Sequence, residues 1–277
     1  MRVGTFNLWS GRGRDGLVDA GRLAESVRSL ADAGVDVLVV QEVDRGQPRS
    51  GGADQLGAVA EAFGAVDARF CPTVFGEPGS AAGWVPATAG LDQQVDEQHP
   101  STPPAPSYGI GVVSRLPVLA WRLRRLRGSR AVLPVAVPRD GRGMRVLWVS
   151  DEPRAALAAV VAGDSGPVTV IGVHLSFAPP AAVRQLRTVR RWADSLPGPR
   201  VLAGDLNLPG GVPARVTGWR SLARASTFPA ADPRVQLDHV LTDAASDPVE
   251  HKDSRTGEAL LLPLSDHRAL VADDVRL

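Results

Sequence analysis

Short apolar runs recur along the whole chain, and they restrict its fold more than any other feature. Each run is bounded by turn-forming residues and either alternates apolar with polar positions or is wholly apolar, as is typical of β-strands. The runs are RVGTFNL, VDVLVVQE, YGIGVVS, AVLPVAVP, MRVLWV, PVTVIGVHL, RVLAGDL, QLDHVL and HRALVADDV. Helical periodicity is convincing only over Asp19 to Ala33, Gln55 to Phe63 and Ala181 to Leu196. So many strands with so few helices between them predict a mixed α/β sandwich and disfavour a regular βαβ repeat.

One stretch is ambiguous between helix and strand. The alanines of PRAALAAVVAGDSGPVTVIGVHL favour a helix, but GDSGP is a turn and the run after it is strand-like. We therefore predict a β-hairpin here.

The chain shows no internal repeat and no shift in composition that would divide it. With 277 residues it is long enough for one large domain or two small ones. We expect a single domain over residues 1–277. Residues 76–106, rich in Pro, Gly, Ala and Ser, are predicted to be a flexible loop insertion on the surface, with a lid over a site as the alternative.

Charge and cysteine content limit the partners and the compartment. The formal net charge is +1, so attraction to nucleic acid or to anionic lipid must come from a local patch. Cys71 is the only cysteine, which excludes an internal disulfide framework and fits a reducing compartment. The N-terminal residues show no signal-type segment and no stretch reaches membrane-spanning length. These features predict a soluble, cytoplasmic protein with no membrane insertion and no obligate protein partner.

A glycine-rich segment near the N-terminus has a competing interpretation. GRGRDG, from Gly11 to Gly16, follows a strand-like run and matches a dinucleotide-binding fingerprint, with Glu42 at the end of the next run. In that fingerprint the last glycine lies inside the start of the helix, whereas here the capping residue Asp19 delays the helix. We therefore disfavour nucleotide binding at this segment.

Polar side chains stand at the ends of many of the predicted strands. Strand ends are where α/β proteins build sites, because the backbone is rigid there and the side chains reach the surface. The residues in such positions are Asn7, Glu42, His174, Asp205, Asn207, Asp238, Asp266 and His267.

These residue types narrow the chemistry. Carboxylates are hard oxygen ligands that suit Mg²⁺ or Mn²⁺ and are poor for zinc. The sequence has no cysteine cluster, no H-E-x-x-H and no G-x-S-x-G, so neither a zinc protease nor a serine nucleophile is supported. A water activated beside a divalent cation is the economical alternative, and it points to hydrolysis of a phosphate ester. Taken alone, Asp205 with Asn207 could form an Asx turn, and His174 could be a satisfied core histidine.

Seven motifs in order resemble one known family. TFNLW, VVQEVD, SYGIGVVSR, VHLS, GDLNLP, TFPAADPRVQLDHVL and LSDHRALV occur as in the endonuclease/exonuclease/phosphatase superfamily, which includes deoxyribonucleases, abasic-site nucleases, sphingomyelinases and inositol polyphosphate phosphatases. The resemblance extends from Asn7 to His267. It implies a four-layer, deoxyribonuclease-like α/β sandwich, with two central mixed sheets faced by helices and the site at one rim. It also implies metal-dependent cleavage of a phosphoester.

The resemblance assigns roles to particular residues. Glu42 would be the principal ligand of Mg²⁺ or Mn²⁺, helped by Asn7 and Asp266. Asp205 would orient or deprotonate the attacking water. The other implied catalytic residues are Asn207, which fixes the water and the phosphate, His267 paired with Asp238, which stabilises phosphoryl charge, and Tyr108 and His174, which contact the phosphate or assist the leaving group.

Two departures from the family pattern leave the substrate open. Ile110 stands where the family has Asn two residues after the Tyr, and Gly172-Val173 replaces the Asn-Thr before His-Leu. The chain also lacks the aromatic, basic loop that abasic-site nucleases insert into DNA. The run from Trp121 to Arg130 interleaves arginines with apolar residues; it could follow a nucleic-acid backbone, but we favour a strand with one wet face.

Three functions follow for testing. The first is a metal-dependent phosphodiesterase or nuclease acting with an activated water, the second is a phosphomonoesterase or a phospholipid hydrolase, and the third is a binding module with an inactive site. Retention of Glu42, Asp205, Asp266 and His267 together argues against the third. We expect a phosphate ester as the substrate, with nucleic acid as one candidate.

Overall fold

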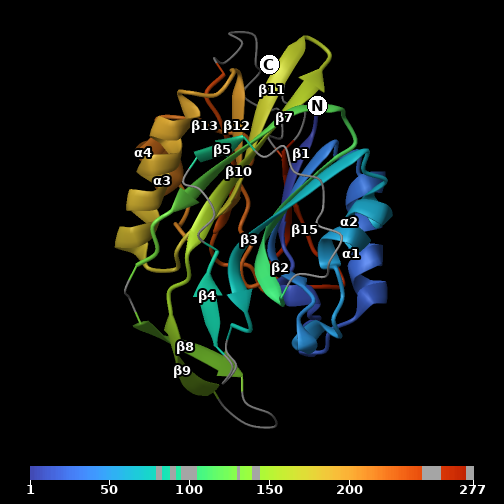
Figure 1. Ribbon diagram of the computed structural model, residues 1–277, viewed down its shortest axis with the longest axis vertical. Helices are drawn as coiled ribbons and strands as arrows, with labels where there is room; N and C mark the ends of the chain where they lie inside the picture. The colour runs from blue at the N-terminus through green and yellow to red at the C-terminus, as the bar shows by residue number, and fades with distance from the viewer. Residues whose placement is uncertain are drawn as a thin grey trace.

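Two β-sheets packed face to face form the centre of the molecule, and a pair of helices covers each outer face (Figure 1). The structure is a computed structural model that describes residues 1–78, 83–87, 92–94, 105–129, 132–138, 144–244 and 257–272. This arrangement confirms the predicted four-layer α/β sandwich.

The first sheet has seven strands within the described part of the chain, in the order β15-β16-β1-β2-β6-β3-β4. β1 and β2 are parallel and their neighbours are antiparallel, so the sheet is mixed. Its strands are β1 (Val3–Asn7), β2 (Val37–Arg45), β3 (Asp67–Gly76), β4 (Trp84–Pro86), β6 (Ser107–Ser114), β15 (Glu258–Leu260) and β16 (Ala269–Ala272).

The second sheet follows the order β13-β14-β12-β11-β10-β7-β5 over the described residues. β10 and β11 form the hairpin predicted from the ambiguous stretch, with the turn at Asp164 and Ser165. The strands are β5 (Asp92–Gln94), β7 (Val118–Leu126), β10 (Arg154–Gly163), β11 (Gly166–His174), β12 (Arg200–Asp205), β13 (Arg220–Ser221) and β14 (Asp238–Thr242). A separate pair, β8 (Val132–Pro138) and β9 (Met144–Ser150), lies at the lower end of the view in Figure 1.

The predicted loop insertion falls largely outside the described residues. β4 and β5 lie within the 76–106 segment, but residues 79–82, 88–91 and 95–104 are not described, and these include His99; His251 is not described either. The flexible loop therefore stays a prediction.

The helices form where the apolar spacing predicted them. α1 (Ala20–Asp32) begins at Asp19, whose carboxylate accepts a hydrogen bond from the Arg22 amide at 2.9 Å, so the glycine-rich segment that precedes it does not open a helix. α2 (Gln55–Phe63) has the predicted bounds. α3 (Pro179–Ala193) begins two residues before the predicted start, because proline is well suited to the first turn, and the short α4 (Val212–Thr217) was not predicted.

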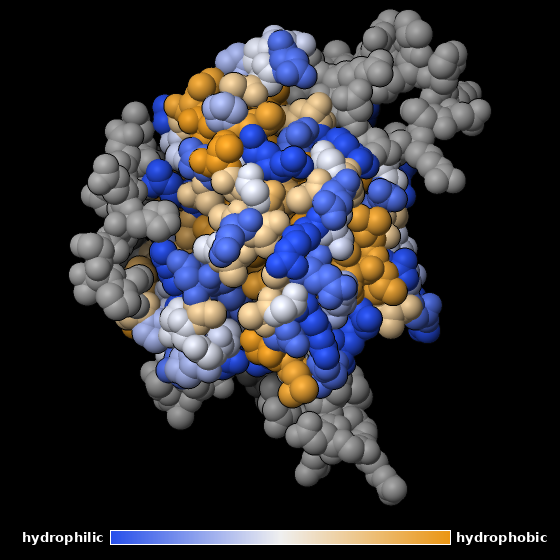
Figure 2. Space-filling view, turned by 90° about the vertical axis from the view of Figure 1, so that its right-hand side faces the viewer, coloured by the Kyte–Doolittle hydropathy of each residue, from blue (hydrophilic) through white to orange (hydrophobic). Residues whose placement is uncertain are grey.

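Each pair of helices covers one sheet. Leu23, Val27 and Leu30 of α1 pack with α2 residues on the outer face of the first sheet, and Leu186 and Val189 of α3 pack on the outer face of the second. Figure 2 looks at the side that carries α1 and α2 and shows hydrophilic side chains spread over much of that face. No helix in the described part of the chain is both long and apolar enough to span a bilayer.

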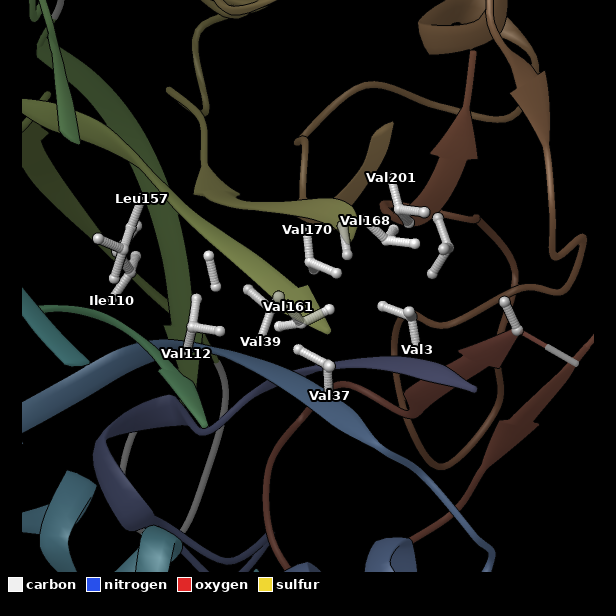
Figure 3. Packing of buried hydrophobic residues seen from close by; sticks show 14 of the residues in the cluster. Val3, Val37, Val39, Ile110, Val112, Leu157, Val161, Val168, Val170 and Val201 are labelled. Carbon is white, nitrogen blue, oxygen red and sulfur yellow. The ribbon is translucent and has the colours of Figure 1, made fainter. Parts of the chain in front are cut away.

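The core between the sheets is built mainly from small β-branched and aliphatic side chains. Figure 3 shows Val37, Val39 and Val112 of the first sheet pointing toward Val168 and Val170 of the second. Burial of such side chains is the main stabilising contribution to the fold. Gly172 lets the two sheets approach, because a Cβ at this position would lie 2.8 Å from Val39 Cγ1 and 3.0 Å from Val112 Cγ2.

We expect Gly172→Ala to lower the free energy of unfolding by about 1–3 kcal/mol, since the added methyl group overpacks two stiff valines. The measurement is urea unfolding followed by circular dichroism. Gly211→Ala is the matched control, because a Cβ at Gly211 meets no atom within 4 Å. Equal unfolding free energies for the two variants would show that the inter-sheet space is not tight at Gly172.

Candidate active site

The polar residues of the site continue the inward-facing rows of the two sheets at one end of the sandwich. On β1, Asn7 follows Val3 at even spacing, and on β12, Asp205 follows Val201 and Ala203, which belong to the inter-sheet core. Because side chains two residues apart share a face of a strand, Asn7 and Asp205 face the space between the sheets. Asn7 is 1% exposed and Asp205 is 2% exposed.

The same alternation places two further residues and excludes a third. His174 shares the inward face of β11 with Val170, and Asp238 shares the inward face of β14 with Val240. His239 therefore points outward, and its Nε2 lies 2.8 Å from the carbonyl oxygen of Leu208. The structure thus keeps His239 out of the cluster.

Glu42 reaches the inward face only because β2 is irregular. Leu38 and Val40 both pack on the helix side of the sheet, and simple alternation would send Glu42 to that side too. The register of β2 against β6 shifts between Val40 and Val43, and Glu42 has a left-handed φ of 55°. This β-bulge turns the carboxylate of Glu42 toward Asn7.

An amide joins two of the carboxylates. Asn7 Nδ2 lies 3.1 Å from Glu42 Oε1 and 3.1 Å from Asp205 Oδ2, and donates to both. Asn7 Oδ1 in turn accepts from the amide of Trp9 at 3.0 Å, which fixes the orientation of the side chain. Asn7 therefore holds together residues that are far apart in the chain, since Asp205 follows it by 198 positions.

Asp205 and Asn207 form both a turn and part of the site. The Asn207 amide donates to Asp205 Oδ1 at 2.9 Å, which is the Asx turn that the Asp-x-Asn pattern allowed. Asp205 Oδ2 stays available to the cluster, 3.6 Å from His174 Nε2 and 3.9 Å from His267 Nε2. Burial and the charge of Asp238 raise the pKa of Asp205 to about 7, although His267 opposes the rise. The local turn thus orients a carboxylate that can exchange a proton near neutral pH.

His267 and Asp238 form a buried ion pair. His267 Nδ1 lies 2.8 Å from Asp238 Oδ2, and the Phe228 ring packs against the imidazole with ring centroids 4.9 Å apart. Burial alone would lower the pKa of His267, but Asp238, with smaller contributions from Asp205 and Asp266, raises it to about 10. His267 is therefore protonated and positively charged at neutral pH.

Arg154 determines the protonation of His174. Arg154 Nη1 lies 3.1 Å from His174 Nδ1, and both side chains are buried. Because a guanidinium can only donate, Nδ1 must be the unprotonated nitrogen and Nε2 must carry the hydrogen. Burial, Arg154 and His267 together hold the pKa of His174 well below its usual range. His174 is thus a neutral donor whose Nε2–H points toward Asp205.

Arg154 belongs to a charged group that the sequence prediction missed. It lies next to Glu152, and its Nη2 is 3.7 Å from Asp151 Oδ1. Within the described part of the chain, Arg154 Nε and Glu152 Oε2 are buried without a hydrogen-bond partner. The run DEPR before an apolar strand was the available signal, but the segment indicated only the start of a hairpin.

Tyr108 and Asp266 complete the set by proximity. Tyr108 begins the inward row of β6, and burial followed by the charge of Glu42 raises its pKa. Arg49, which pairs with the buried Asp44 at 2.7 Å, lies over the Tyr108 ring at 5.2 Å from its centroid. Burial raises the pKa of Asp266 to about 6, with Glu42 contributing and His267 opposing. All nine residues predicted for the site therefore lie at one end of the sandwich.

The carboxylates suit a hard divalent cation. Burial raises the pKa values of Glu42, Asp205 and Asp266, and the charge of Glu42 raises that of Asp266 further. A bound cation would relieve this repulsion, and carboxylate and amide oxygens are the ligands that Mg²⁺ prefers. Among the described residues, Asp205, Asp238 and His267 also come close enough together to hold an ion. The closeness of His267 and Asp238 is also explained by their ion pair, because His267 Nδ1 lies 2.8 Å from Asp238 Oδ2.

We expect Arg154→Met to release the tautomer of His174. Without the guanidinium, Nδ1 can take the proton, so long-range ¹H–¹⁵N spectra should change from the Nε2–H form alone to a mixture. Arg49→Met is the control, because it removes a cation beside Tyr108 that makes no contact with His174. An unchanged His174 spectrum in folded Arg154→Met would show that Arg154 does not set the tautomer.

Comparisons with known structures agree on the fold. The chain is similar to an endonuclease/exonuclease/phosphatase from Beutenbergia cavernae, with 24% identity, a TM-score of 0.58 and coverage of 98% of this chain and 70% of that one. It is similar to an endonuclease/exonuclease/phosphatase from Bacteroides vulgatus, with 16% identity, a TM-score of 0.59 and coverage of 98% and 97%. It is also similar to beta toxin from Staphylococcus aureus with bound magnesium ions, with 14% identity, a TM-score of 0.57 and 98% coverage of both chains.

Sequence comparison gives the family. A search of curated proteins found no match. The model of the Endonuclease/Exonuclease/phosphatase family matches residues 4–267, which is nearly the whole chain and spans every residue of the candidate site. With the sandwich and the ordered motifs in place, the chain belongs to the endonuclease/exonuclease/phosphatase family.

Proposed function

We propose that the protein is a metal-dependent phosphoester hydrolase that cleaves phosphodiesters with an activated water. The observation that carries the proposal is the joining of Glu42 and Asp205 through Asn7, with Asp205 Oδ2 only 3.9 Å from the charged imidazole of His267. Carboxylates that can bind a metal ion, a base that can activate water and a positively charged imidazole that can face the phosphate then lie within one cluster. Phosphoryl transfer needs this kind of positioning and charge neutralisation more than covalent chemistry.

Glu42, with Asn7 and Asp266, would hold Mg²⁺ or Mn²⁺. When bound, such an ion acts as a Lewis acid on a phosphoryl oxygen and lowers the pKa of a bound water. The structurally similar beta toxin is described with bound magnesium ions, which supports this choice of metal.

Asp205 and Asn207 would place the attacking water. With a pKa of about 7, Asp205 can accept the proton of the water at neutral pH. Asn207 Nδ2 donates to the carbonyl of Leu175 at 3.0 Å, so its side chain is held in place beside His174. A fixed amide of this kind can orient the water and a phosphate oxygen together.

His267, His174 and Tyr108 would face the phosphate. His267 carries a positive charge supported by Asp238 and would stabilise the charge that develops on the phosphoryl oxygens. His174 is neutral and would donate its Nε2–H, and Tyr108, with a raised pKa, would donate its hydroxyl. The site therefore supplies one cationic and two neutral donors.

Removal of the metal and replacement of Asp205 test the proposal directly. We expect excess chelator to abolish hydrolysis of bis-p-nitrophenyl phosphate, and added Mg²⁺ to restore it. Asp205→Asn should lower kcat by roughly 10²- to 10⁴-fold, the usual loss when a general base is removed, because an amide cannot accept the proton. Circular dichroism should show an unchanged fold.

Asp232→Asn is the matched control, since Asp232 is exposed and its only ion pair among the described residues is with the exposed Arg234. Full activity in excess chelator would contradict the metal-dependent mechanism.

A panel of single-stranded DNA, inositol phosphates and sphingomyelin then identifies the class of ester that the protein cleaves. No activity on any of them with metal bound would favour an inactive binding module.

Replacement of Asp238 tests the charge on His267. In chelated protein, Asp238→Asn should lower the pKa of His267 from about 10 toward its usual value, because the buried partner charge is lost. The shift is measured by ¹⁵N titration of the imidazole. With metal, kcat should fall by roughly 10²- to 10³-fold, as when one donor to a transition-state oxyanion is lost. An unaltered titration of His267 would contradict the pairing.

A further inference from the structure

A second feature of the molecule is an arginine-lined cavity between β7 and α3. It has a volume of about 300 Å³, and five of its eight described lining residues are arginines. None of these eight residues is acidic. The cavity lies on the outer side of the second sheet, so it is separate from the inter-sheet site.

Three of the arginines have charges that no described residue neutralises. Within the described part of the chain, Arg127, Arg184 and Arg191 form no ion pair, whereas Arg190 of the same helix pairs with Asp194. Arg125 is engaged elsewhere, because it donates to the carbonyl of Pro72. Concentrated positive charge around one cavity is a feature of sites for phosphate groups.

The arginines extend over a length that matches several phosphates. Arg184, Thr188 and Arg191 lie on one face of α3, and seven helical residues rise about 10 Å. Arg124 to Arg127 spans about 10 Å along the opposite wall, by the rise of a strand. A length of about 10 Å is enough to meet more than one phosphate of a nucleic-acid strand.

The cavity lies close to the candidate active site, on the other side of the second sheet. Gln185, 2% exposed, donates from Nε2 to the Arg127 carbonyl at 3.0 Å and accepts from the Ser176 amide at 2.8 Å. Ser176 follows His174 by two residues, and Leu126 pairs with Arg154 across β7 and β10. The cavity and His174 therefore lie at the same end of the second sheet, joined by Gln185.

We propose that this cavity binds the phosphodiester backbone of a nucleic-acid strand beyond the bond that is cleaved. The inference rests on the proposed phosphodiesterase function for its catalytic role. A lipid headgroup fits less well. Among the described lining residues Leu126, 4% exposed, is the only apolar one, whereas proteins that bind membrane surfaces expose apolar side chains to the lipid. The arginine-rich run that forms a strand thus also supplies one wall of a binding site.

The test measures binding without catalysis. Anisotropy of a fluorescein-labelled single-stranded DNA 12-mer is followed in excess chelator for the wild-type protein, for Arg184→Gln/Arg191→Gln and for Arg187→Gln. Arg187 is exposed on the same helix but does not line the cavity, so its variant controls for the removal of a single positive charge from α3. We expect the double variant to bind about tenfold more weakly or worse, since charged hydrogen bonds are lost. The slope of log K against log salt should fall in magnitude by about 1.4.

Three outcomes overturn the proposal. The first is equal affinity of the double variant and Arg187→Gln for the 12-mer, and the second is an unchanged salt slope. The third comes from a parallel assay with vesicles of sphingomyelin and phosphatidylserine: the double variant loses affinity for the vesicles but not for the 12-mer. The proposed activity is judged separately, by metal-dependent hydrolysis of bis-p-nitrophenyl phosphate by the wild-type protein. If that hydrolysis fails while the double variant still loses affinity, the cavity binds a strand but the proposed function is wrong.

Discussion

The alternation of side chains on the two facing sheets, broken at Glu42 by the bulge of β2, is the constraint on which the rest of the structure depends. The inward rows that supply Val3, Val170 and Val201 to the core end in Asn7, His174 and Asp205. The apolar layer and the polar site are therefore one continuous surface, and the packing of the valines fixes where the polar groups meet. The rigidity of this core is what allows an amide on one sheet to reach a carboxylate on the other at 3.1 Å.

Much of this arrangement could be predicted from the sequence, because strand patterns and strand ends are local signals. The apolar runs predict the sheets, and the even spacing of Asp205 from Val201 and of Asp238 from Val240 predicts which face they share. The opposite orientation of His239 follows from the same rule. The resemblance to the family adds the order of the motifs, which no single strand could provide.

Three features could not be predicted, for different physical reasons. The orientation of Glu42 depends on a bulge, and an extra residue in a strand leaves no reliable pattern in the sequence. The role of Arg154 depends on a contact between neighbouring strands, which becomes visible only when the register of β10 and β11 is known. The arginine cavity likewise needs both β7 and α3, since neither wall alone is more than a basic stretch.

The apolar wall behind the site has a consequence for its electrostatics. Ile110, at the position where the family has an asparagine, is 2% exposed and belongs to the inter-sheet core, and Gly172 lets that core close tightly. Because hydrocarbon stands in place of amides and water, the effective dielectric constant around the site is lower. Opposite charges then attract more strongly, and burial of an unpaired charge costs more free energy. The acidic and basic groups of the site therefore depend on one another. A substitution that neutralises one of them leaves the charge of its neighbour unpaired in an apolar environment. Substitutions at the site are therefore tolerated best when they remove both partners of an ion pair.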